Sequence, residues 1–396
     1  MSWDDVPLAA VLTSLESGTR PPGGAGEELD GVPSIGGEHL SSDGTFNFDR
    51  RKTVPQNFFD SMKSGKIQPQ DILVVKDGAT TGKTSYVGFD FPYAESAVNE
   101  HVFRVEVDRS RADPSFVFRF LHSPQGQRSI LRDFRGATVG GIGRGFIDVV
   151  RVPLPPLPEQ RRIASILDQA DTLRAKRRLA LTHLHQLVSA EFNELFGDPS
   201  SGPAKYDRLP LGEIGRVITG NTPPRDDVEN YGNSIEWVKS DNLGGEAAVV
   251  AAASEWLSAK GRVRARVVGR DAILVTCIAG SPNSIGNAAM ADRDVAFNQQ
   301  INALVPSQQH DPWFLLGQFR AAKALVQRAS TGGMKGLVSK SRFEAIEFIV
   351  PPLGLQQKFG RSFQEIEKLK NAHYVHLTKL DELFVSLQHR AFAGEL

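Results

Sequence analysis

Two long segments of this chain repeat one another at a constant spacing. Residues 155–160 read Pro-Pro-Leu-Pro-Glu-Gln and begin a segment that ends near Phe196. Residues 351–356 read Pro-Pro-Leu-Gly-Leu-Gln and begin a segment that ends near Phe392. Matched residues lie 196 positions apart, in the pairs Pro155/Pro351, Leu157/Leu353, Gln160/Gln356, Asp171/Glu367, Leu173/Leu369, Leu184/Leu380, Leu187/Leu383 and Phe196/Phe392. A repeat of about half the chain is too long for a solenoid unit. The sequence therefore predicts two copies of a module that joins a globular part to a helical part.

Each repeated segment has the pattern of one long amphipathic helix. Apolar residues recur at three- and four-residue steps with charged residues between them, which predicts one apolar stripe along each helix. The stripes include Ile163, Leu167, Leu173, Leu184, Leu187 and Phe196 in the first segment, and Phe359, Phe363, Leu369, Leu380, Leu383 and Phe392 in the second. Prolines before each segment, and Gly197 and Gly394 after them, are typical of helix ends.

The length of these helices predicts that they pair with each other. A helix of about 38 residues is much longer than the ~10–14 residues typical of globular proteins. One apolar stripe of that length needs a partner surface, and the two stripes match in length and phase. We therefore expect the helices to pair antiparallel as a coiled coil. The alternative is that each helix packs on its own globular part.

The globular parts have the pattern of mixed structure that is mostly β. Short apolar runs such as 72–75 and 273–275 are bounded by Gly, Asp, Asn and Pro, as strands are. The second part repeats the order of the first, while its polar loop residues differ. The sequence predicts an α+β fold with two mixed α/β domains, mostly β, separated by two long helices in a pseudo-two-fold arrangement. The expected boundaries are 1–152 and 199–350 for the domains, and 153–198 and 351–396 for the helices.

Composition limits the classes of function. The chain has 46 basic and 46 acidic residues, and none of the four segments is strongly basic. A protein that holds nucleic acid alone usually has a basic excess. Either this chain does not bind nucleic acid, or partners supply much of the phosphate contact. A single cysteine excludes an intrachain disulfide and is typical of a reducing cytoplasm. We expect no signal peptide and no membrane span, since no apolar run approaches ~20 residues.

A search for catalytic motifs finds little. Residues 78–84, Gly-Ala-Thr-Thr-Gly-Lys-Thr, resemble a phosphate-binding loop, but Asp77 stands where that loop needs glycine. A strand-like run follows where a helix should begin, so we reject an NTPase site that uses Lys83 and expect a tight hairpin. One cysteine and scattered histidines make a structural zinc site unexpected, and no nucleophile lies beside a base. The sequence predicts no catalytic site in this chain.

Polar loops interleaved with glycine lie at parallel places in both globular parts. Arg, Lys, Asn, Ser and Thr side chains are those that reach phosphates and base edges. The candidates for DNA contact are Arg20, His39, Lys76, Thr80, Thr81, Lys83, Arg135 and Arg144 in the first part, and Arg225, Lys239, Ser240, Asn242, Ser281, Asn283, Lys335 and Lys340 in the second.

These features together resemble a known family. The doubled Pro-Pro-Leu signature and the ending at residues 380–396 are similar to the specificity subunit of type I restriction-modification systems, as are residues 35–40, 220–223 and 237–241. The resemblance covers essentially the whole chain. The second signature departs from the first, because Gly354 and Leu355 stand where Pro158 and Glu159 stand.

The resemblance implies a non-catalytic subunit that binds double-stranded DNA. Each variable domain would read one half of a split, asymmetric site. The helices would dock two modification subunits, which bind S-adenosylmethionine and methylate adenine at N6, and ATP-driven restriction subunits that use Mg could join them. The chain itself would hold no cofactor or metal and would act in the bacterial or archaeal cytoplasm. Partner contacts are expected on the exposed faces of the helix starts, at Pro156, Glu159, Gln160, Arg161, Pro352, Gln356 and Gln357.

The helices would then act as a ruler between two half-sites. A helix of about 38 residues is ~57 Å long, which is the length of ~17 base pairs of B-DNA and an upper bound on the separation of the reading domains. Two alternatives remain. One is the specificity chain of a related methylation-only or single-complex restriction system. The other is a scaffold that joins proteins and has no role on DNA.

Overall fold

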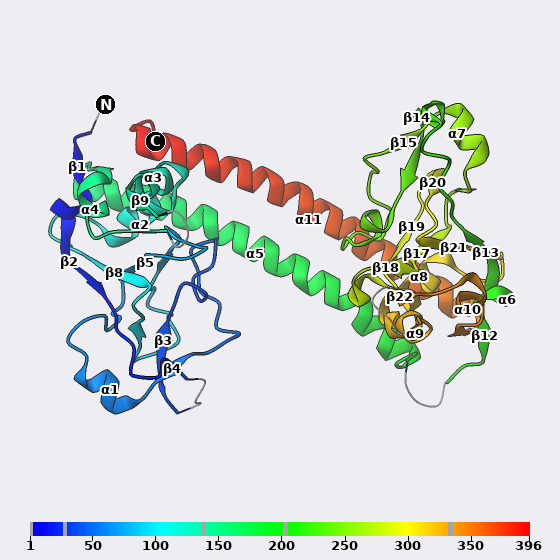
Figure 1. Ribbon diagram of the computed structural model, residues 1–396, viewed down its shortest axis with the longest axis horizontal. Helices are drawn as coiled ribbons and strands as arrows, with labels where there is room; N and C mark the ends of the chain where they lie inside the picture. Colours follow the sequence, from blue (N-terminus) through cyan, green and yellow to red (C-terminus); the bar gives the residue numbers. More distant parts are fainter. Residues whose placement is uncertain (1–2, 27–29, 137–139, 201–204, 332–335) are drawn as a thin grey trace. The chain divides into compact units, whose positions relative to one another are not determined.

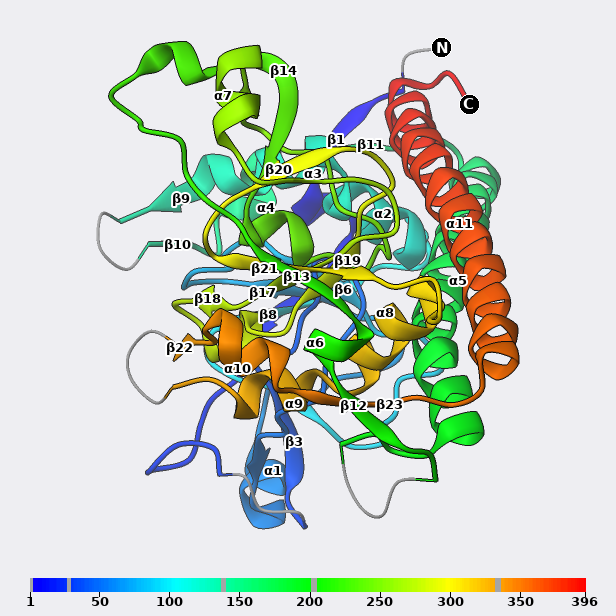
Figure 2. The same cartoon turned by 90° about the vertical axis from the view of Figure 1, so that its right-hand side faces the viewer.

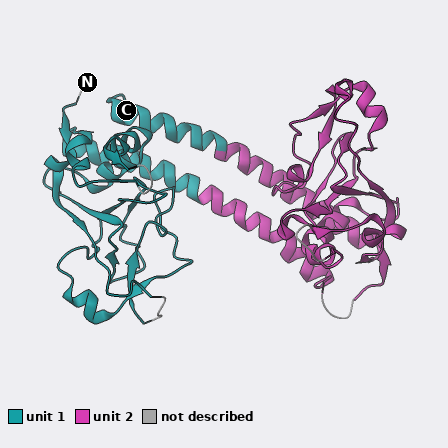
Figure 3. Cartoon of the chain, viewed as in Figure 1, with its two compact units in different colours: residues 1–175, 378–396 teal, residues 176–377 magenta. Residues whose placement is uncertain are grey.

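The computed structural model describes residues 3–26, 30–136, 140–200, 205–331 and 336–396, and it divides into two compact units (Figures 1 and 3). Unit 1 contains Met1–Ala175 and Thr378–Leu396, and unit 2 contains Lys176–Leu377. The boundary falls inside both long helices, so each unit holds one globular part and a stretch of each helix. The four-part division expected from the sequence is a different partition, and it stays a prediction.

Unit 1 contains a four-stranded antiparallel sheet, ordered β2-β8-β5-β6, and a three-stranded sheet, ordered β4-β3-β7, in which β3 and β7 run parallel. Its strands are β1 (Asp5–Pro7), β2 (Leu12–Ser17), β3 (Val32–Ile35), β4 (Thr53–Val54), β5 (Ile72–Val75), β6 (Thr84–Tyr86), β7 (Ala97–Val98), β8 (Val102–Val107), β9 (Phe134–Arg135), β10 (Gly141–Ile142) and β11 (Arg151–Pro153). Its short helices are η1 (Leu8–Val11), α1 (Gln56–Ser61), α2 (Pro114–His122), α3 (Pro124–Ile130), η2 (Leu131–Asp133) and α4 (Phe146–Val149).

Unit 2 repeats this plan with a sheet ordered β13-β21-β17-β19 and a second sheet ordered β15-β14-β20-β16, in which β14 and β20 run parallel (Figure 2). Its strands are β12 (Arg208–Pro210), β13 (Gly215–Thr219), β14 (Tyr231–Val238), β15 (Trp256–Leu257), β16 (Val267–Val268), β17 (Ile273–Thr276), β18 (Ile278–Ala279), β19 (Ala288–Met290), β20 (Val295–Phe297), β21 (Ile301–Pro306), β22 (Gly336–Leu337) and β23 (Glu347–Ile349). Its short helices are α6 (Leu211–Ile214), η3 (Val228–Asn230), η4 (Ser240–Leu243), α7 (Ala259–Arg264), η5 (Pro282–Ser284), α8 (Pro312–Ala321), α9 (Lys323–Arg328) and α10 (Lys340–Glu344).

The two units share their strand pairing as well as their strand order. The parallel pair places Ile35 opposite Val98 in unit 1 and Val238 opposite Phe297 in unit 2. The strand before each long helix pairs antiparallel with the first strand of the same unit, β11 with β1 and β23 with β12. The predicted α+β class, with two globular parts that are mostly β and two long helices, is confirmed.

The two long helices are α5 (Leu157–Phe196) and α11 (Leu353–Ala393). In unit 1, Arg174 Nε donates to Asp381 at 2.6 Å, and Arg162 donates to the carbonyl of Leu396 at 2.7 Å. Residues later in α5 thus lie beside residues earlier in α11, so the helices run antiparallel there.

In unit 2 the same two helices also run antiparallel. Ser362 Oγ donates to Glu191 at 2.7 Å, and a guanidinium nitrogen of Arg177 lies 3.3 Å from His373 Nδ1. The predicted antiparallel pairing is therefore observed within each unit. Among the described residues, no helix combines the length and the apolarity that crossing a membrane requires.

Aromatic side chains fix the helices to the globular part of each unit. In unit 1, the ring of Phe392 packs edge-on against Phe116 and Phe120, with centroids 5.7 and 5.3 Å apart. In unit 2, Phe192 stacks on Phe314 at 5.7 Å and meets Phe359 edge-on at 5.4 Å. Each helix thus packs on its partner helix and also on a globular part, so the two packing modes weighed from the sequence occur together. Truncation of a buried phenylalanine typically costs about 3–5 kcal/mol.

Part of the predicted apolar stripe lies outside the core. Leu173, Leu187, Leu369 and Leu383 have exposed fractions between 48% and 54%. Assigning these four leucines to the buried stripe is therefore wrong. The apolar positions of a straight helix drift by ~20° per heptad, so apolar residues on two faces of a 40-residue helix look like one stripe in sequence.

A buried glutamine fixes the start of each long helix. Gln160 Oε1 accepts from the amide of Asp113 at 2.8 Å, and its Nε2 donates to the carbonyl of Pro155 at 2.8 Å. The Asp113 side chain in turn accepts from the amide of Phe116 at 3.0 Å and so caps α2. One side chain therefore joins the proline turn, the first turn of α5 and the beginning of α2.

Gln356 makes the same contacts in unit 2. Its Oε1 accepts from the amide of Asp311 at 3.0 Å, and its Nε2 donates to the carbonyl of Pro351 at 2.7 Å. Asp311 caps α8 through the amide of Phe314 at 2.9 Å. The expectation that Gln160 and Gln356 lie on exposed helix faces is wrong, because both side chains are buried and their polar atoms are used internally. The other expected docking residues, Pro156, Glu159, Arg161, Pro352 and Gln357, are exposed or half-exposed.

We expect Gln356→Ala to lower the free energy of unfolding by about 2–4 kcal/mol, because it leaves the Asp311 amide and the Pro351 carbonyl without a partner. The matched control is Gln357→Ala, which removes an exposed glutamine one position along and should change stability by no more than about 0.5 kcal/mol. Urea unfolding followed by circular dichroism measures both. Equal losses for the two variants would contradict a structural role for Gln356.

Candidate nucleic-acid interface

In both units, one backbone frame holds the loop that follows an inner strand of a four-stranded antiparallel sheet. That strand is β5 of the sheet β2-β8-β5-β6 in unit 1 and β17 of the sheet β13-β21-β17-β19 in unit 2. In unit 1, the amide of Lys76 donates to the carbonyl of His101, and the carbonyl of Lys76 accepts from the amide of Ile142, both at 2.8 Å. In unit 2, the amide of Cys277 donates to the carbonyl of Gln300, and its carbonyl accepts from the amide of Val338, again both at 2.8 Å. Three loops therefore meet at the same end of this antiparallel sheet in each unit.

In unit 1, two of the candidate cations lie beside carboxylates. Arg20 Nε is 2.9 Å from Glu100, and Lys76 Nζ is 3.8 Å from Asp77. Lys76 also donates to the carbonyl of Glu100 at 3.4 Å, and His101 lies between the two acids. The structure thus brings Arg20 and Lys76 together, and their positive charges are balanced locally.

The loop between β5 and β6 is a hairpin. Thr80 and Thr81 lie at its tip, where Thr81 Oγ1 donates to the carbonyl of Gly78 at 2.7 Å. Lys83 Nζ donates to the carbonyl of Leu40 at 2.9 Å, so its ammonium group is engaged within the protein. Strand β6 follows the loop directly and pairs antiparallel with β5, which confirms the expected hairpin.

Of the three remaining unit 1 candidates, two are exposed and one lies inside the protein. Arg135 is exposed on β9 and pairs with Asp133 at 2.9 Å, and the β9–β10 hairpin touches Asp77. Arg144 is exposed and donates to the carbonyl of Leu15 at 3.0 Å. The buried ring of His39 accepts from the amide of Gly36 at 2.9 Å. We therefore remove His39 from the candidate interface, because its side chain supports the loop from within.

In unit 2, cations and aromatic rings gather around one carboxylate. The guanidinium of Arg225 lies 5.0 Å from the ring centre of Trp237 and 5.2 Å from that of Tyr231. Lys239 Nζ lies 5.2 Å from the Trp237 ring. Both cations reach Glu255, Arg225 at 3.1 Å and Lys239 in a shorter contact. Lys239, followed by Arg225, lowers the pKa of Glu255, so the carboxylate stays charged and holds both cations over the rings.

The other unit 2 candidates lie in three places. Asn242 accepts from the amide of Lys239 at 2.9 Å, and Ser240 Oγ lies 3.3 Å from Gln300 Oε1, so both belong with the Trp237 cluster. Ser281 and Asn283 are exposed around η5, which follows β18. Lys340 is exposed at the start of α10 and lies 3.5 Å from Glu344. Lys335 falls outside the described residues. Contact of any of these residues with DNA stays a prediction.

A basic run in residues 260–270 was not among the residues predicted from the sequence to contact DNA. Lys260, Arg262, Arg264, Arg266 and Arg270 lie there with no acidic residue between them, which is the signal that could have found them. The first three pair with carboxylates. Arg266 is exposed, makes no ion pair among the described residues, and has its amide bonded to Asn221 at 2.7 Å. The Asn221 carbonyl accepts from the indole of Trp237 at 3.3 Å, so Arg266 extends the cluster.

Cys277, which follows β17, is buried. Burial raises the pKa of Cys277 to about 12, so the cysteine stays a thiol at neutral pH. In the described part of the chain, no three His, Cys, Asp or Glu side chains gather closely enough to hold a metal ion. The arrangement is suited to binding through charge, aromatic faces and amides.

The chain matches a family model described as the type I restriction modification DNA specificity domain over residues 3–183 and 203–378. It is 22% identical to the specificity subunit of the type I restriction enzyme StySPI of Salmonella potsdam, over 100% of this chain and 89% of that protein. It is 20% identical to the EcoR124I/EcoR124II specificity subunit of Escherichia coli, over 76% and 74%. It is also 25% identical to the HindI specificity subunit of Haemophilus influenzae, over 49% of this chain but only 42% of that protein.

Two solved structures have the same fold. One is the S subunit of a type I restriction-modification system from M. genitalium, with a TM-score of 0.63 at 15% identity, covering 99% of this chain and 96% of that one. The other comes from work on complex assembly and conformational transition of the type I R-M system, with a TM-score of 0.58 at 18% identity, covering 100% and 98%.

We expect Glu255→Gln to increase the attraction of unit 2 for polyanions, because it releases Arg225 and Lys239 from their shared carboxylate. The matched control is Glu213→Gln, which removes the same charge from an exposed position on α6. Elution from heparin resin in a salt gradient measures the effect. Glu255→Gln should elute at higher salt than Glu213→Gln, and coincident elution would mean that Glu255 does not restrain these cations.

Proposed function

Since the chain belongs to the family of type I restriction modification DNA specificity domains, we propose that it selects the double-stranded DNA sequence on which a type I restriction-modification complex acts. Each unit reads one half of a split site. The observation that carries this proposal is the shared backbone frame with different side chains upon it. Lys76 and His101 in unit 1 stand where Cys277 and Gln300 stand in unit 2. One scaffold with two sets of side chains is suited to two different half-sites.

The charges of the loops favour a DNA-binding subunit that depends on partner subunits for its affinity. Affinity for DNA comes largely from cations that neutralise phosphates, and in this chain Arg20, Lys76, Arg225 and Lys239 are already balanced by carboxylates. A phosphate must compete with those carboxylates, so DNA binding by this chain alone is weak. The balance favours base contacts as the source of selectivity, with partner subunits supplying the electrostatic clamp.

In this proposal, the partner subunits carry out the catalytic steps. Two modification subunits bind S-adenosylmethionine, extrude the target adenine from the helix and methylate it at N6, since a stacked base is out of reach. Restriction subunits that use ATP and Mg join where the system cleaves DNA. The chain itself positions the duplex and carries out no catalytic step. Because chromosomal DNA is its substrate, we place it in the bacterial or archaeal cytoplasm.

Exposed apolar residues at matching positions of the two helices are our candidates for partner docking. Leu173/Leu369, Leu179/Val375 and Leu187/Leu383 each lie 196 positions apart, and all six side chains have exposed fractions between 48% and 56%. A soluble surface rarely keeps large apolar side chains exposed at repeated positions unless they bind something. Two equivalent sets fit two copies of one partner.

The helices also fix the distance between the half-sites in this proposal. Co-expression with a cognate modification subunit, followed by long-read mapping of N6-methyladenine, should give a bipartite and asymmetric motif. Seven residues inserted after both Arg178 and His373, which extend the facing stretches of α5 and α11, should lengthen the gap by about three base pairs. A seven-residue insertion after Arg109, in a surface turn, is the control. An active long-helix variant with an unchanged gap would exclude the ruler.

The mapping also separates the alternatives. A methylation-only or single-complex system would give the same kind of bipartite motif without cleavage by separate restriction subunits. A scaffold without a role on DNA would give no methylated motif that depends on this chain.

We expect Leu187→Gln and Leu383→Gln together to weaken binding of the modification subunit by tenfold or more, because apolar anchors dominate interface energies. Stability should change by no more than about 0.5 kcal/mol, since both positions are half-exposed. Ser189→Gln, at an exposed position of the same helix, is the control. Native mass spectrometry of the mixture counts the bound subunits. Full occupancy with the double variant would exclude this docking surface.

A further inference from the structure

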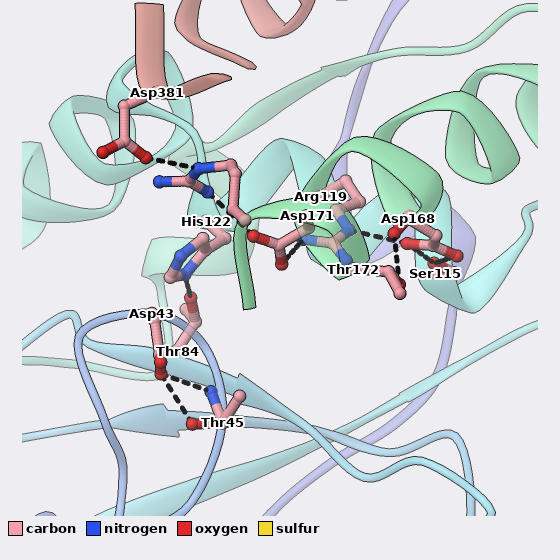
Figure 4. Close-up of polar contacts among 11 residues, drawn as sticks. Asp43, Thr45, Thr84, Ser115, Arg119, His122, Asp168, Asp171, Thr172 and Asp381 are labelled. Carbon is pink, nitrogen blue, oxygen red and sulfur yellow. Dashed lines mark hydrogen bonds and ion pairs between the residues drawn. The ribbon is translucent and has the colours of Figure 1, made fainter. Parts of the chain in front are cut away.

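Unit 1 contains a cleft of about 590 Å³ whose walls come from four segments. Two are loops, residues 43–48 and 86–92, and two are helices, α2 and α5. Figure 4 shows the polar groups at its helical wall, where Arg119 of α2 points at Asp168 and Asp171 of α5. None of the functions proposed above uses this cleft, which is built from residues of unit 1 alone.

The internal repeat shows what occupies the corresponding place in unit 2. The amide of Tyr86 donates to the carbonyl of Gly44 at 3.2 Å, and the amide of Met290 donates to the carbonyl of Ala248 at 2.8 Å, so the loops around Gly44 and Ala248 correspond. By the offset of 196, Asp171 and Arg174 correspond to Glu367 and Lys370.

In unit 2, the loop around Ala248 lies directly on the helices. The amide of Ala248 donates to Glu367 at 3.1 Å, and Lys370 Nζ donates to the carbonyl of Glu246 at 3.0 Å. Arg320 of α8 also donates to the carbonyl of Glu246, at 3.3 Å. A stretch of polypeptide therefore satisfies the helix side chains in unit 2.

In unit 1, the matching helix groups are held by other side chains. Arg119 donates to Asp171 at 2.8 Å, and Arg174 bridges Asp171 and Asp381 at 2.8 and 2.6 Å. The loop instead approaches α2, where a side chain added at Gly44 would meet the ring of Phe118 at 2.7 Å. The space beside α5 that a loop covers in unit 2 is open in unit 1.

The cleft favours a positively charged occupant. Its lining residues carry the carboxylates of Asp43, Asp90, Asp168 and Asp171, and the last two pair with the guanidinium groups of Arg119 and Arg174. Asp90 is exposed and makes no ion pair among the described residues. The rings of Phe46, Phe48 and Phe91 also line the cleft and pack on one another at centroid distances of 5.0–5.8 Å. Carboxylates and aromatic faces together are the surroundings that guanidinium and ammonium groups prefer.

We propose that this cleft binds an arginine-containing segment of a partner protein. The segment occupies the place that residues 244–248 fill in unit 2, and its guanidinium lies between Asp90 and the phenylalanine rings. A polypeptide is favoured over a small molecule because the internal repeat fills the same place with polypeptide. The proposal is independent of DNA reading, since it uses neither the candidate loops nor the exposed leucines.

The test is fluorescence polarisation of a fluorescein-labelled hexapeptide of alternating glycine and arginine with the purified full chain. The same peptide with glutamate in place of arginine should not bind. Asp90→Asn should weaken binding about fivefold, the upper range for an exposed charge pair. Asp60→Asn, which removes an exposed carboxylate from α1, should leave it within twofold. Equal effects of the two variants would overturn the proposal.

A second variant fills the cleft. Thr172→Arg places a guanidinium inside it and should weaken peptide binding more than tenfold. Thr182→Arg is the matched control, because both threonines are exposed on α5 and both donate to the carbonyl four residues earlier. Unchanged melting curves exclude misfolding, and Asp90→Asn serves where Thr172→Arg melts early. Equimolar spermidine should not displace the peptide, and displacement by it would replace the peptide proposal with a site for small cations.

Discussion

A buried glutamine at the start of each long helix determines how that helix leaves its globular unit. The side-chain amide of Gln160 or Gln356 joins a proline turn to the aspartate that caps the neighbouring helix. Proline fixes the backbone angle of the turn, and the glutamine fixes its distance from α2 or α8. A polar side chain with both hydrogen-bonding groups satisfied in a buried place tolerates little movement. Each long helix therefore begins in the same place relative to the neighbouring helix, α2 in unit 1 and α8 in unit 2.

The same rigidity allows the loops to vary. The backbone bonds of Lys76 and Cys277 are the same in the two units, while their side chains have nothing in common. Because those bonds do not depend on the side chain, the same frame holds a half-exposed lysine in unit 1 and a buried cysteine in unit 2. The cations of the loops lie beside carboxylates. A sequence with zero net charge can therefore still offer basic groups to a phosphate that displaces those carboxylates. Neutral composition and a role on DNA are compatible for that reason.

The sequence allowed the fold to be predicted better than the site. The offset of 196 residues and the periodicity of three to four residues revealed the duplication and both helices, because these are local patterns. Burial is a tertiary property, and the errors lie there. Gln160 and Gln356 look like solvent-facing helix residues until α2 and α8 are placed beside them. Leu173 and Leu187 look like core residues until the drift of a 40-residue helix is known. His39 looks like a loop residue, yet its ring lies inside the loop it supports. The shared carboxylate of Glu255 joins residues far apart in sequence, and no pattern predicts such a contact.

Duplication also makes the differences between the copies informative. The fold repeats closely, so the common scaffold does not explain a space that a loop covers in one unit and leaves open in the other. Residues 244–248 satisfy Glu367 and Lys370 in unit 2, whereas Asp171 and Arg174 in unit 1 are satisfied by side chains and leave a cleft. The helix starts differ in the same sense, since Glu159 pairs with Arg162 in one copy and Leu355 is partly exposed in the other. A partner that contacts both copies therefore meets two related but unequal surfaces. Equal docking would require the partner to ignore the positions at which the copies differ, including Leu355, whose exposed fraction is 39%.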